Sequence, residues 1–328
     1  MTGAVTVVLD AVLVTGLLAA AGFALFHPRR SAAVVMFLAF GISLAIIWAR
    51  IGAPDIALAE AAIGAGVTSA LMLDAVTGRR RPEPERSGRL VPAVGTALAV
   101  ALAAVLAWAF LAEPGRPPPG PGALAAGRID ESGVTHGVTA VLLNFRSYDT
   151  LLEVAVLLAA VLAALSLQPE AGLGRVPDPG PAPPVLDLLG RLLAPVLVVL
   201  AGWVVVAGSS RPGGAFQAGA VLAGALLLLR LSGHPDAVPT GRWLRPSLTA
   251  GLAVFLLLAY ATVLLGRDWL TLDPAWAGQA IVAVEVVLAG SIGATLAALF
   301  VANQPPAPVA LARFRPAPDE RHAAGARR

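Results

Sequence analysis

Residues 275–302 read AWAGQAIVAVEVVLAGSIGATLAALFVA, and Glu285 is the one ionisable side chain in this apolar stretch. The stretch is long enough to cross a bilayer core of about 30 Å, which takes about 20 apolar residues in an α-helix. A charged side chain in the middle of such a helix costs about 2.5–3.5 kcal/mol on insertion scales. We therefore expect Glu285 to be paired, hydrated or part of an ion route.

The rest of the chain also has the composition of a membrane protein. Of its 328 residues, 57% are hydrophobic and 13% are charged, whereas soluble domains carry about 25% charged residues. No stretch shows the alternation that is typical of a transmembrane β-strand. The sequence predicts an all-α, polytopic integral membrane protein with about nine transmembrane helices, at residues 4–26, 31–49, 56–77, 90–112, 150–168, 185–208, 215–231, 246–266 and 275–302.

Composition excludes several classes of function. The chain has no cysteine, which excludes disulfides, thiolate metal sites and a cysteine nucleophile. Its four histidines are scattered without the spacing of metal ligands, so no metal site is expected. All 23 basic residues are arginines, and they form no stripe interleaved with aromatic residues. We therefore expect no nucleic-acid partner, no cofactor and no enzymatic activity.

The arginines predict the orientation of the chain in a bacterial cell membrane. Most of them follow the first, third, fifth and seventh spans or lie in the C-terminal tail, and the opposite side holds only Arg50, Arg116, Arg128, Arg146, Arg211 and Arg267. By the positive-inside rule, the N-terminus lies outside and the C-terminus in the cytoplasm. At the cytoplasmic ends of spans, Arg230 is expected to snorkel, and Asp187 and Arg191 to pair on one helix face.

Polar and proline-rich segments divide the chain into modules. A cytoplasmic linker at residues 78–89 and a proline-rich linker at residues 169–184 separate groups of spans. The resulting units are a three-helix module, a two-helix module with an outer loop, a four-helix module and a disordered cytoplasmic tail, at residues 1–77, 90–168, 185–303 and 304–328.

The segment 52–60, GAPDIALAE, places two acids at the start of the third span. Asp55 suits the positive end of the helix dipole, and the alternative to a transport role is that it only caps the helix. Glu60 lies deeper, and steps of four residues align it with Gly64 and Thr68, which are small enough for close helix packing. We expect Glu60 to face protein or a hydrated cavity. Both acids are candidates for ion translocation, with a structural hydrogen bond as the alternative for Glu60.

The segment 144–153, NFRSYDTLLE, brings three charged side chains to the start of the fifth span. Thr150 and Glu153 fit the S/T-x-x-E capping box with which many helices begin. This interpretation explains both residues without a transport role. Arg146 and Asp149 are near enough in sequence to pair at the membrane surface, which contributes about 1 kcal/mol or less when exposed.

The segment 209–217, SSRPGGAFQ, joins the sixth and seventh spans. Gly213 and Gly214 allow backbone torsions that other residues avoid, which predicts a tight structural turn after which Gln217 enters the membrane. An ordinary outer turn without a further role is the alternative. The segment lacks the lysine and hydroxyl residue of a phosphate-binding loop.

The face of the last span that carries Glu285 is lined by small residues. Steps of four residues reach Ala289, Gly293 and Ala297, a pattern that favours close helix packing. Burial favours the uncharged form of a carboxyl group, so Glu285 could take up and release protons near neutral pH. The alternative is a protonated Glu285 that donates one static hydrogen bond.

These segments, in this order, resemble parts of the Mrp-type multisubunit cation/proton antiporters and the related membrane-bound hydrogenases. Residues 51–70, IGAPDIALAEAAIGAGVTSA, are similar to the C-terminal end of the antiporter's A subunit or to a separate small hydrogenase subunit. Residues 134–167 resemble the next block of that region, although Asn144 stands where the family commonly has Asp. Residues 185–302 look like the antiporter's B subunit, with Ala215 in place of one glycine of its usual Gly-Gly-Gly-Phe motif.

The resemblance implies a fusion of the antiporter's B subunit with the tail of its A subunit, within a large membrane complex that exchanges Na⁺ for H⁺. The implied partners are long subunits akin to complex I proton pumps, several small membrane subunits, the lipid bilayer, and the ions themselves. It also implies that Glu60 and Glu153 stand where the family carries an acid in its ion route, with Asp149 and Arg146 shaping an outer entrance. Glu285 would take protons or contact Na⁺.

Three alternatives remain open at this point. The same architecture could serve a hydrogenase or another redox-driven ion pump. The chain could be a scaffold that conducts nothing, in which case Glu60→Gln and Glu285→Gln would leave transport intact. It could also be a stand-alone transporter, although a chain without lysine lacks the lysine-bearing helices of the long subunits.

Overall fold

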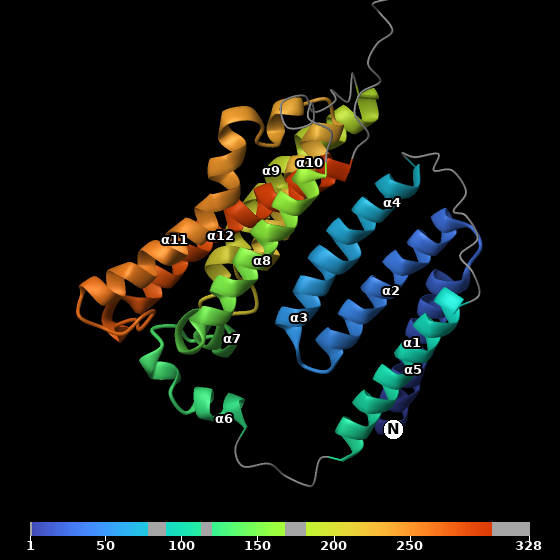
Figure 1. Ribbon diagram of the computed structural model, residues 1–328, viewed down its shortest axis with the longest axis horizontal. Coiled ribbons are helices and arrows are strands. Elements are labelled where there is room, and N and C mark those ends of the chain that lie inside the picture. Colours follow the sequence, from blue (N-terminus) through green and yellow to red (C-terminus); the bar gives the residue numbers. More distant parts are fainter. Residues whose placement is uncertain (1, 78–89, 113–119, 168–181, 304–328) are drawn as a thin grey trace, which may run out of the picture.

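The chain folds into a bundle of long helices (Figure 1). The computed structural model describes residues 2–77, 90–112, 120–167 and 182–303, and every regular element in these ranges is a helix. Seven helices are long and apolar enough to cross a membrane, and two further apolar helices are shorter. The predicted all-α polytopic membrane fold is confirmed for this part of the chain. The predicted linker 78–89 and tail 304–328, and all but the end of linker 169–184, lie outside the described residues.

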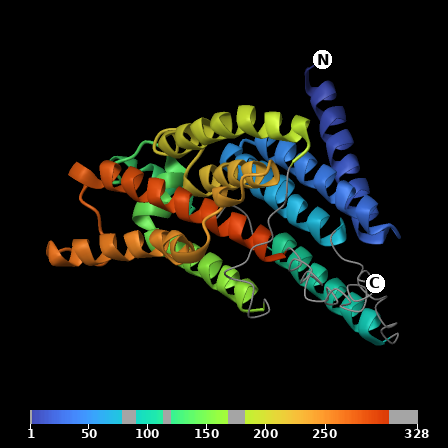
Figure 2. The ribbon, with the colours of Figure 1, turned by 90° about the horizontal axis from the view of Figure 1, so that it is seen from above.

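The last helix, α12 (Pro274–Asn303), forms the centre of the bundle (Figure 2). Of the residues in its most apolar window 72% are buried, whereas none is buried in that of α1 (Thr2–Phe26). α12 is surrounded by α8 (Ser147–Ser166), α9 (Pro184–Ala207), α10 (Ala215–Leu231) and α11 (Leu244–Leu264). The stretch that carries Glu285 therefore builds the core around which the other spans pack.

Glycines set the close approach of α10 and α12. A Cβ atom added to Gly219 would lie 3.1 Å from the carbonyl oxygen of Ala289, and one added to Gly293 would lie 3.1 Å from the carbonyl oxygen of Gly219. Ala297, one turn beyond Gly293 on α12, is fully buried. The small residues that follow Glu285 in steps of four thus form the predicted packing face.

The N-terminal helices form a second layer beside this core. α2 (Arg30–Arg50) packs against α1 and against a long interrupted helix, which consists of α3 (Pro54–Ala59), η1 (Glu60–Thr68) and α4 (Ser69–Thr77). The contact between α2 and η1 is close, because a Cβ atom on Gly41 would lie 3.1 Å from Cα of Ala65. η1 also contacts α10, so it joins the two layers.

The middle of the third span is a π-helix rather than the regular α-helix that the four-residue steps assume. In a π-helix the hydrogen bonds run from residue i to residue i+5. The four-residue count therefore does not describe the period of this segment, although Glu60 and Gly64 still lie together. The wider turn brings Gly64 directly under Glu60, where an added Cβ atom would overlap the Glu60 carboxylate.

The polypeptide before α8 consists of short helical turns. They are α6 (Pro121–Ala126), the 3₁₀ turn η2 (Ile129–Glu131), α7 (Gly137–Ala140) and the π-helical turn η3 (Val141–Phe145). Arg146 interrupts the helix with φ −134° and ψ 38°, and α8 follows. Two 3₁₀ turns, η4 (Pro235–Ala237) and η5 (Gly241–Trp243), lie between α10 and α11.

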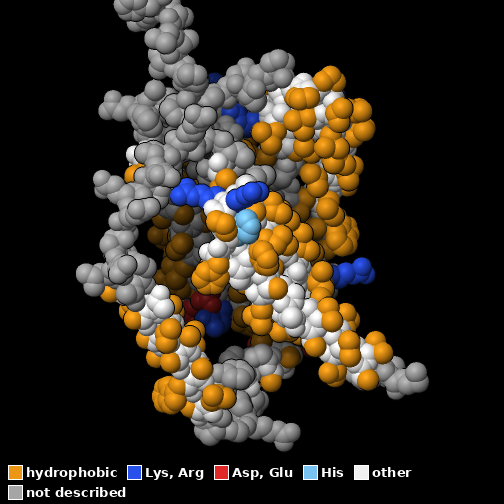
Figure 3. Space-filling view, turned by 90° about the vertical axis from the view of Figure 1, so that its right-hand side faces the viewer, with side chains coloured by type: hydrophobic (Ala, Val, Ile, Leu, Met, Phe, Trp, Pro, Cys, Tyr) orange, Lys and Arg blue, Asp and Glu red, His pale blue; other side chains and the backbone are white. Residues whose placement is uncertain are grey.

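The helix α5 (Leu90–Leu111) stands apart from the core. All its described side chains from Val94 to Ala109 are exposed. Hydrophobic side chains also predominate on the side of the molecule shown in Figure 3. In membrane proteins, apolar helix faces of this kind meet lipid or the helices of other subunits.

Candidate ion-handling site

The site is built around the turn that connects α9 to α10. The N–H of Gly214 donates to the carbonyl oxygen of Val204 at 3.1 Å, which folds the chain back on itself. Gly214 has φ +117°, a conformation that side chains disfavour. A Cβ atom on Gly213 would overlap the carbonyl oxygen of Val204. Both glycines are therefore needed for the shape of this turn.

Asp55 connects the N-terminal layer to this turn. One of its carboxylate oxygens, Oδ1, accepts a hydrogen bond from the N–H of Gly213 at 3.3 Å, and its backbone carbonyl accepts one from Nε2 of Gln217 at 3.3 Å. The side chain makes no capping hydrogen bond in α3, whose N-cap is Ala53. The interpretation that Asp55 only caps its own helix is therefore wrong.

His136 is the second partner of Asp55, and no sequence pattern singled it out. Its Nε2 lies 3.1 and 3.0 Å from the two carboxylate oxygens, and the His136 and Asp55 side chains are only 18% and 13% exposed. The backbone N–H of His136 donates to the carbonyl oxygen of Ser209 at 3.2 Å, and the Thr139 hydroxyl donates to that of Gly208. Segments from three parts of the chain thus meet at the turn.

Glu285 lies directly beneath the turn and is 2% exposed. The backbone amide of Ala215, the first residue of α10, donates a hydrogen bond to its carboxyl group. The first N–H groups of a helix have no partner within the helix, and the positive end of the helix dipole favours an anion. The other carboxyl oxygen, Oε2, is buried and has no hydrogen-bond partner among the described residues.

A cavity of about 210 Å³ joins Glu285 to Glu153. Polar groups in its wall come from Thr139, Thr150 and Gln217, and the remaining lining is the glycine turn and apolar side chains of α7, η3, α10 and α12. Glu153 is exposed at the surface of α8. The cavity therefore runs from a surface acid to a fully buried one.

The start of α8 differs from the predicted capping box. Helix α8 begins at Ser147, so Thr150 lies inside it, and no side chain caps its N-terminus. The Thr150 hydroxyl donates to the carbonyl oxygen of Leu142 at 2.7 Å, across the π-helical turn. Because Glu153 faces the cavity instead of reaching back to a cap, the capping-box interpretation is wrong.

Arg146 and Asp149 pair near the start of α8. Their Nη2 and Oδ2 atoms are 2.8 Å apart, and the side chains are 65% and 37% exposed. Neither residue lines the cavity. Asn144, for which no charge-based role is expected, donates from Nδ2 to the carbonyl oxygen of Ser132 at 2.9 Å.

Glu60 is half-buried and is not among the residues that line the cavity of Glu285. It starts the π-helix η1, five residues after Asp55 on the same continuous helix. The structure therefore brings Glu153, Glu285, Gln217 and the glycine turn together, and places Asp55 on the far side of that turn. Glu60 stands apart from this group.

The prediction for Arg230 is wrong. Its side chain is 1% exposed and donates from Nη1 to the carbonyl oxygen of Pro235 at 3.3 Å. It does not snorkel to the interface, because the η4 turn folds over the end of α10. The predicted pair of Asp187 and Arg191 is present, with Oδ1 and Nε 2.9 Å apart.

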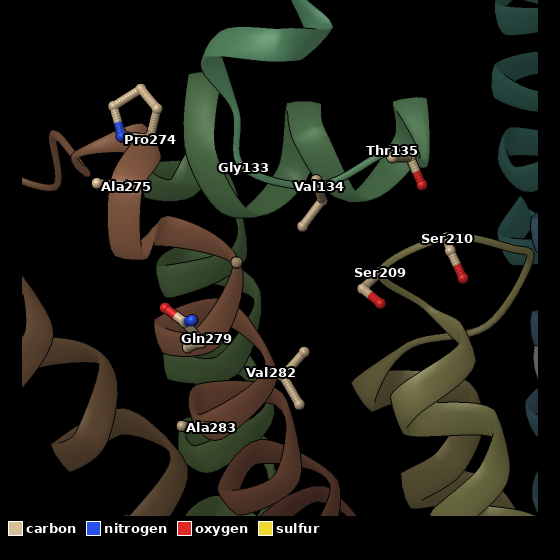
Figure 4. Close-up of a pocket in the computed structure, with 11 residues that line it drawn as sticks. Gly133, Val134, Thr135, Ser209, Ser210, Pro274, Ala275, Gln279, Val282 and Ala283 are labelled. Carbon is tan, nitrogen blue, oxygen red and sulfur yellow. The ribbon is translucent and has the colours of Figure 1, made fainter.

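A second, larger depression lies above the site. Its volume is about 650 Å³, and it is lined by the Gly133–Thr135 segment, by Ser209 and Ser210, and by the first turns of α12. Figure 4 shows Ser209 and Ser210 on the connecting loop, across from Gln279 and Val282 on α12. Val282 is about one helical turn from Glu285, which itself does not line this groove.

No group of three or more His, Asp or Glu side chains in the described ranges is placed to hold a metal ion. The fold and the cavity define a polytopic membrane protein with a fully buried carboxylate in its core. Two solved structures share this fold. A comparison with curated protein sequences found no match.

The first of the two solved structures is a chain of "Structure of Mrp complex from Dietzia sp. DQ12-45-1b", which matches with a TM-score of 0.69 and 22% identity. The match covers 88% of this chain and 34% of that chain, so the present chain spans about a third of its length. The other is a chain of "Structure of the membrane-bound sulfane sulfur reductase (MBS), an archaeal respiratory membrane complex", with a TM-score of 0.53 and 23% identity, over 65% of this chain and 97% of that chain.

Family models identify the two ends of the chain. Residues 185–302 match the model described as "Domain related to MnhB subunit of Na+/H+ antiporter", and residues 15–81 match the model MbhD, which describes the D subunit of MBH. The chain thus contains an MbhD-like domain at residues 15–81 and an MnhB-related domain at residues 185–302.

Proposed function

We propose that this chain is a membrane subunit of a multisubunit monovalent cation/proton antiporter and that its cavity is part of the ion route. The observation that carries the proposal is Glu285, a fully buried carboxyl group with one unpartnered oxygen in a cavity that reaches a surface acid. Ionisable side chains inside a membrane protein are costly and commonly mark ion pathways. Residues 185–302 match a domain related to the MnhB subunit of a Na⁺/H⁺ antiporter, which supports the same proposal.

The geometry argues against a purely structural Glu285. A protonated glutamic acid that serves as helix glue donates its O–H to an acceptor on another helix. The Ala215 amide is a donor, so it stabilises the charged form instead, and Oε2 has no hydrogen-bond partner among the described residues. Leaving a buried polar group unsatisfied costs about 1–3 kcal/mol. Hydration or ion binding in the cavity removes this penalty.

Each predicted acid has a separate role in the proposal. Glu285 exchanges protons or contacts the cation, and Glu153 connects it to the surface, where Asp149 and Arg146 shape the outer entrance. Asp55 holds the glycine turn above the cavity through its contact with Gly213. Glu60 belongs to the same route at another depth, through contacts with subunits that are not part of this chain.

The exposed position of Glu153 on α8 supports the proposed partners, which are long complex I-like subunits and small membrane subunits. Glu153 lies six residues into α8, about 9 Å along the helix axis at 1.5 Å per residue, and its side chain is exposed. A charged group that faces lipid at such depth is costly. We infer that another subunit covers this side of α8. The arginine distribution supports an N-terminus outside and a C-terminus in the cytoplasm of the cell membrane.

The proposal is tested on the complete complex, purified through a tag on this chain and reconstituted in liposomes. We expect an imposed Na⁺ gradient to drive proton movement in the opposite direction, read by a pH-sensitive dye inside the vesicles. The purified chain alone should produce no movement. A complete complex in which neither Na⁺ nor K⁺ moves protons would overturn the proposal.

A redox-driven ion pump is the second candidate, because the fold also matches a chain of a respiratory membrane complex. Co-purification separates the two. Iron–sulfur or nickel-containing subunits, with ion movement that requires an electron donor, indicate the redox-driven pump. Ion exchange without any electron donor indicates the antiporter.

A further inference from the structure

We propose that the cavity between Glu153 and Glu285 is one binding site for which a monovalent cation and a proton compete. The inference rests on the proposed function and adds what the site binds and how exchange is enforced. The cation occupies the site when Glu285 is ionised, and the arriving proton neutralises Glu285 and releases the cation.

The polar groups of the wall are oriented as acceptors. The hydroxyl protons of Thr139 and Thr150 are donated to the carbonyl oxygens of Gly208 and Leu142. Each hydroxyl oxygen therefore keeps its lone pairs for another partner. Because both hydroxyl protons are donated to backbone carbonyls, the wall offers oxygen lone pairs to the cavity. It therefore favours a positive ion over an anion.

The Gln217 side chain also presents a hydrogen-bond acceptor to the cavity. Its amide nitrogen donates to the backbone carbonyl of Asp55 at 3.3 Å, which leaves its side-chain oxygen as an acceptor for the cavity. That oxygen and Oε1 of Glu285 both lie beside Gly214, 3.5 and 3.1 Å from the position that a Cβ atom would occupy there. The glycine thus allows the amide oxygen and the carboxyl group to approach the same space.

The buried carboxyl group supplies an independent indication of a ligand. Glu285 is 2% exposed, lines the cavity, and has no hydrogen-bond partner on Oε2 among the described residues. Together with Glu153, the two threonine hydroxyls and Gln217, it provides a set of oxygen ligands, which hard cations prefer. A volume of about 210 Å³ accepts an ion with a few water molecules, each of which takes about 30 Å³.

The charges around the cavity explain why the two ligands exclude each other. Within the described part of the lining, Glu153 and Glu285 are the two titratable groups. Asp55 and His136 pair on the far side of Gly213, and Arg146 and Asp149 pair at the start of α8. No basic side chain among the described lining residues neutralises the two carboxylates. A cation in the cavity and a proton on Glu285 would therefore neutralise the same buried charge, so that binding of one opposes binding of the other.

The test measures binding of ²²Na⁺ to the purified complex by a scintillation proximity assay between pH 6 and pH 9. Simple competition predicts that the half-saturating Na⁺ concentration rises by up to tenfold per pH unit as the pH falls, with an unchanged number of sites. Glu153→Gln should raise it at least tenfold at pH 9. Glu285→Gln should remove one site per complex.

Two further variants separate ligation from folding. Thr150→Val should weaken Na⁺ binding several-fold, and Thr150→Ser, which keeps the hydroxyl, should restore it. Asp187→Asn is the matched control, because Asp187 is also a helix carboxylate but lies outside the cavity, and it should leave binding unchanged. All variants are compared at equal assembly of the complex.

The outcomes distinguish this inference from the function on which it rests. If the wild-type complex exchanges Na⁺ for protons but Glu285→Gln binds as many Na⁺ ions as wild type, the shared site is wrong and the antiporter assignment stands. A half-saturating Na⁺ concentration that does not change with pH would also overturn the proposal of a shared site. If the complex exchanges no cation for protons at all, the proposed antiporter function itself is wrong.

Discussion

Asp55 and Gly213 are separated by 158 positions in the sequence and are joined by a hydrogen bond of 3.3 Å between the Gly213 nitrogen and Oδ1 of Asp55. One residue lies in the MbhD-like domain and the other in the MnhB-related domain. The contact sits directly above the carboxyl group of Glu285, because the turn that carries Gly213 also carries Gly214. The acid of the MbhD-like domain therefore lies over the cavity that contains Glu285 of the MnhB-related domain.

Replacing Asp55 by Ala should destabilise this junction. The Gly213 amide and the His136 ring would both lose a partner, and an unsatisfied buried group costs about 1–3 kcal/mol. We expect a lower unfolding temperature of the purified complex. Asp55→Ala and His136→Ala should not add when combined, because the two residues share one interaction. Additive losses would show that they stabilise the complex separately.

Replacing Gly214 by Ala should impair transport more than stability. Both Gly214 and Gly266 have positive φ angles, +117° and +76°, so alanine strains the backbone at either position by about 1–3 kcal/mol. A Cβ atom at Gly214 would meet Oε1 of Glu285 at 3.1 Å, whereas at Gly266 it would meet nothing within 4 Å. We expect Gly214→Ala to reduce Na⁺-dependent proton flux strongly, and Gly266→Ala to leave it close to wild type. Equal flux in the two variants would contradict the proposed role of the turn.

Replacing Gly219 by Val should prevent normal packing of α10 on α12. An added Cβ atom would crowd Ile292 and the carbonyl oxygen of Ala289, and overpacking of a tight contact costs about 1–3 kcal/mol. Gly224→Val on the same helix is the control, since a Cβ atom there meets nothing within 4 Å of it. Assembly, measured by native gel electrophoresis, should fall only for Gly219→Val.

Replacing Arg146 by Ala should change transport kinetics without a measurable change in stability. The pair with Asp149 is largely exposed, and such pairs contribute about 1 kcal/mol or less. If these residues shape the outer entrance, the half-saturating Na⁺ concentration for flux should shift several-fold. Arg191→Ala removes an equally exposed partner of Asp187 and should leave it unchanged. A Na⁺ dependence identical to wild type in Arg146→Ala would remove Arg146 from the route.

The membrane fold could be predicted because span length and hydrophobicity are local properties of the sequence. Glu285 could be selected for the same reason, since a single acid in a long apolar helix is visible without any partner. The packing face of Ala289, Gly293 and Ala297 followed from the α-helical period, which α12 keeps throughout.

Other features depend on departures from that period or on contacts between distant segments. The π-helix from Glu60 to Thr68 has no sequence signal that a four-residue count detects. His136 is an isolated histidine in a loop, and only the fold brings it to Asp55. Thr150 and Glu153 have the spacing of a capping box, yet the helix begins earlier, at Ser147, so Thr150 is not at its N-terminus.

The most direct test of the central claim is Na⁺-dependent proton flux in everted membrane vesicles that carry the whole complex with Glu285→Gln. Glutamine keeps the shape of the side chain and can accept the Ala215 hydrogen bond, but it cannot exchange a proton. We predict normal assembly with flux reduced at least tenfold relative to wild type. Flux equal to wild type at normal assembly would contradict the claim that this buried carboxyl group handles ions.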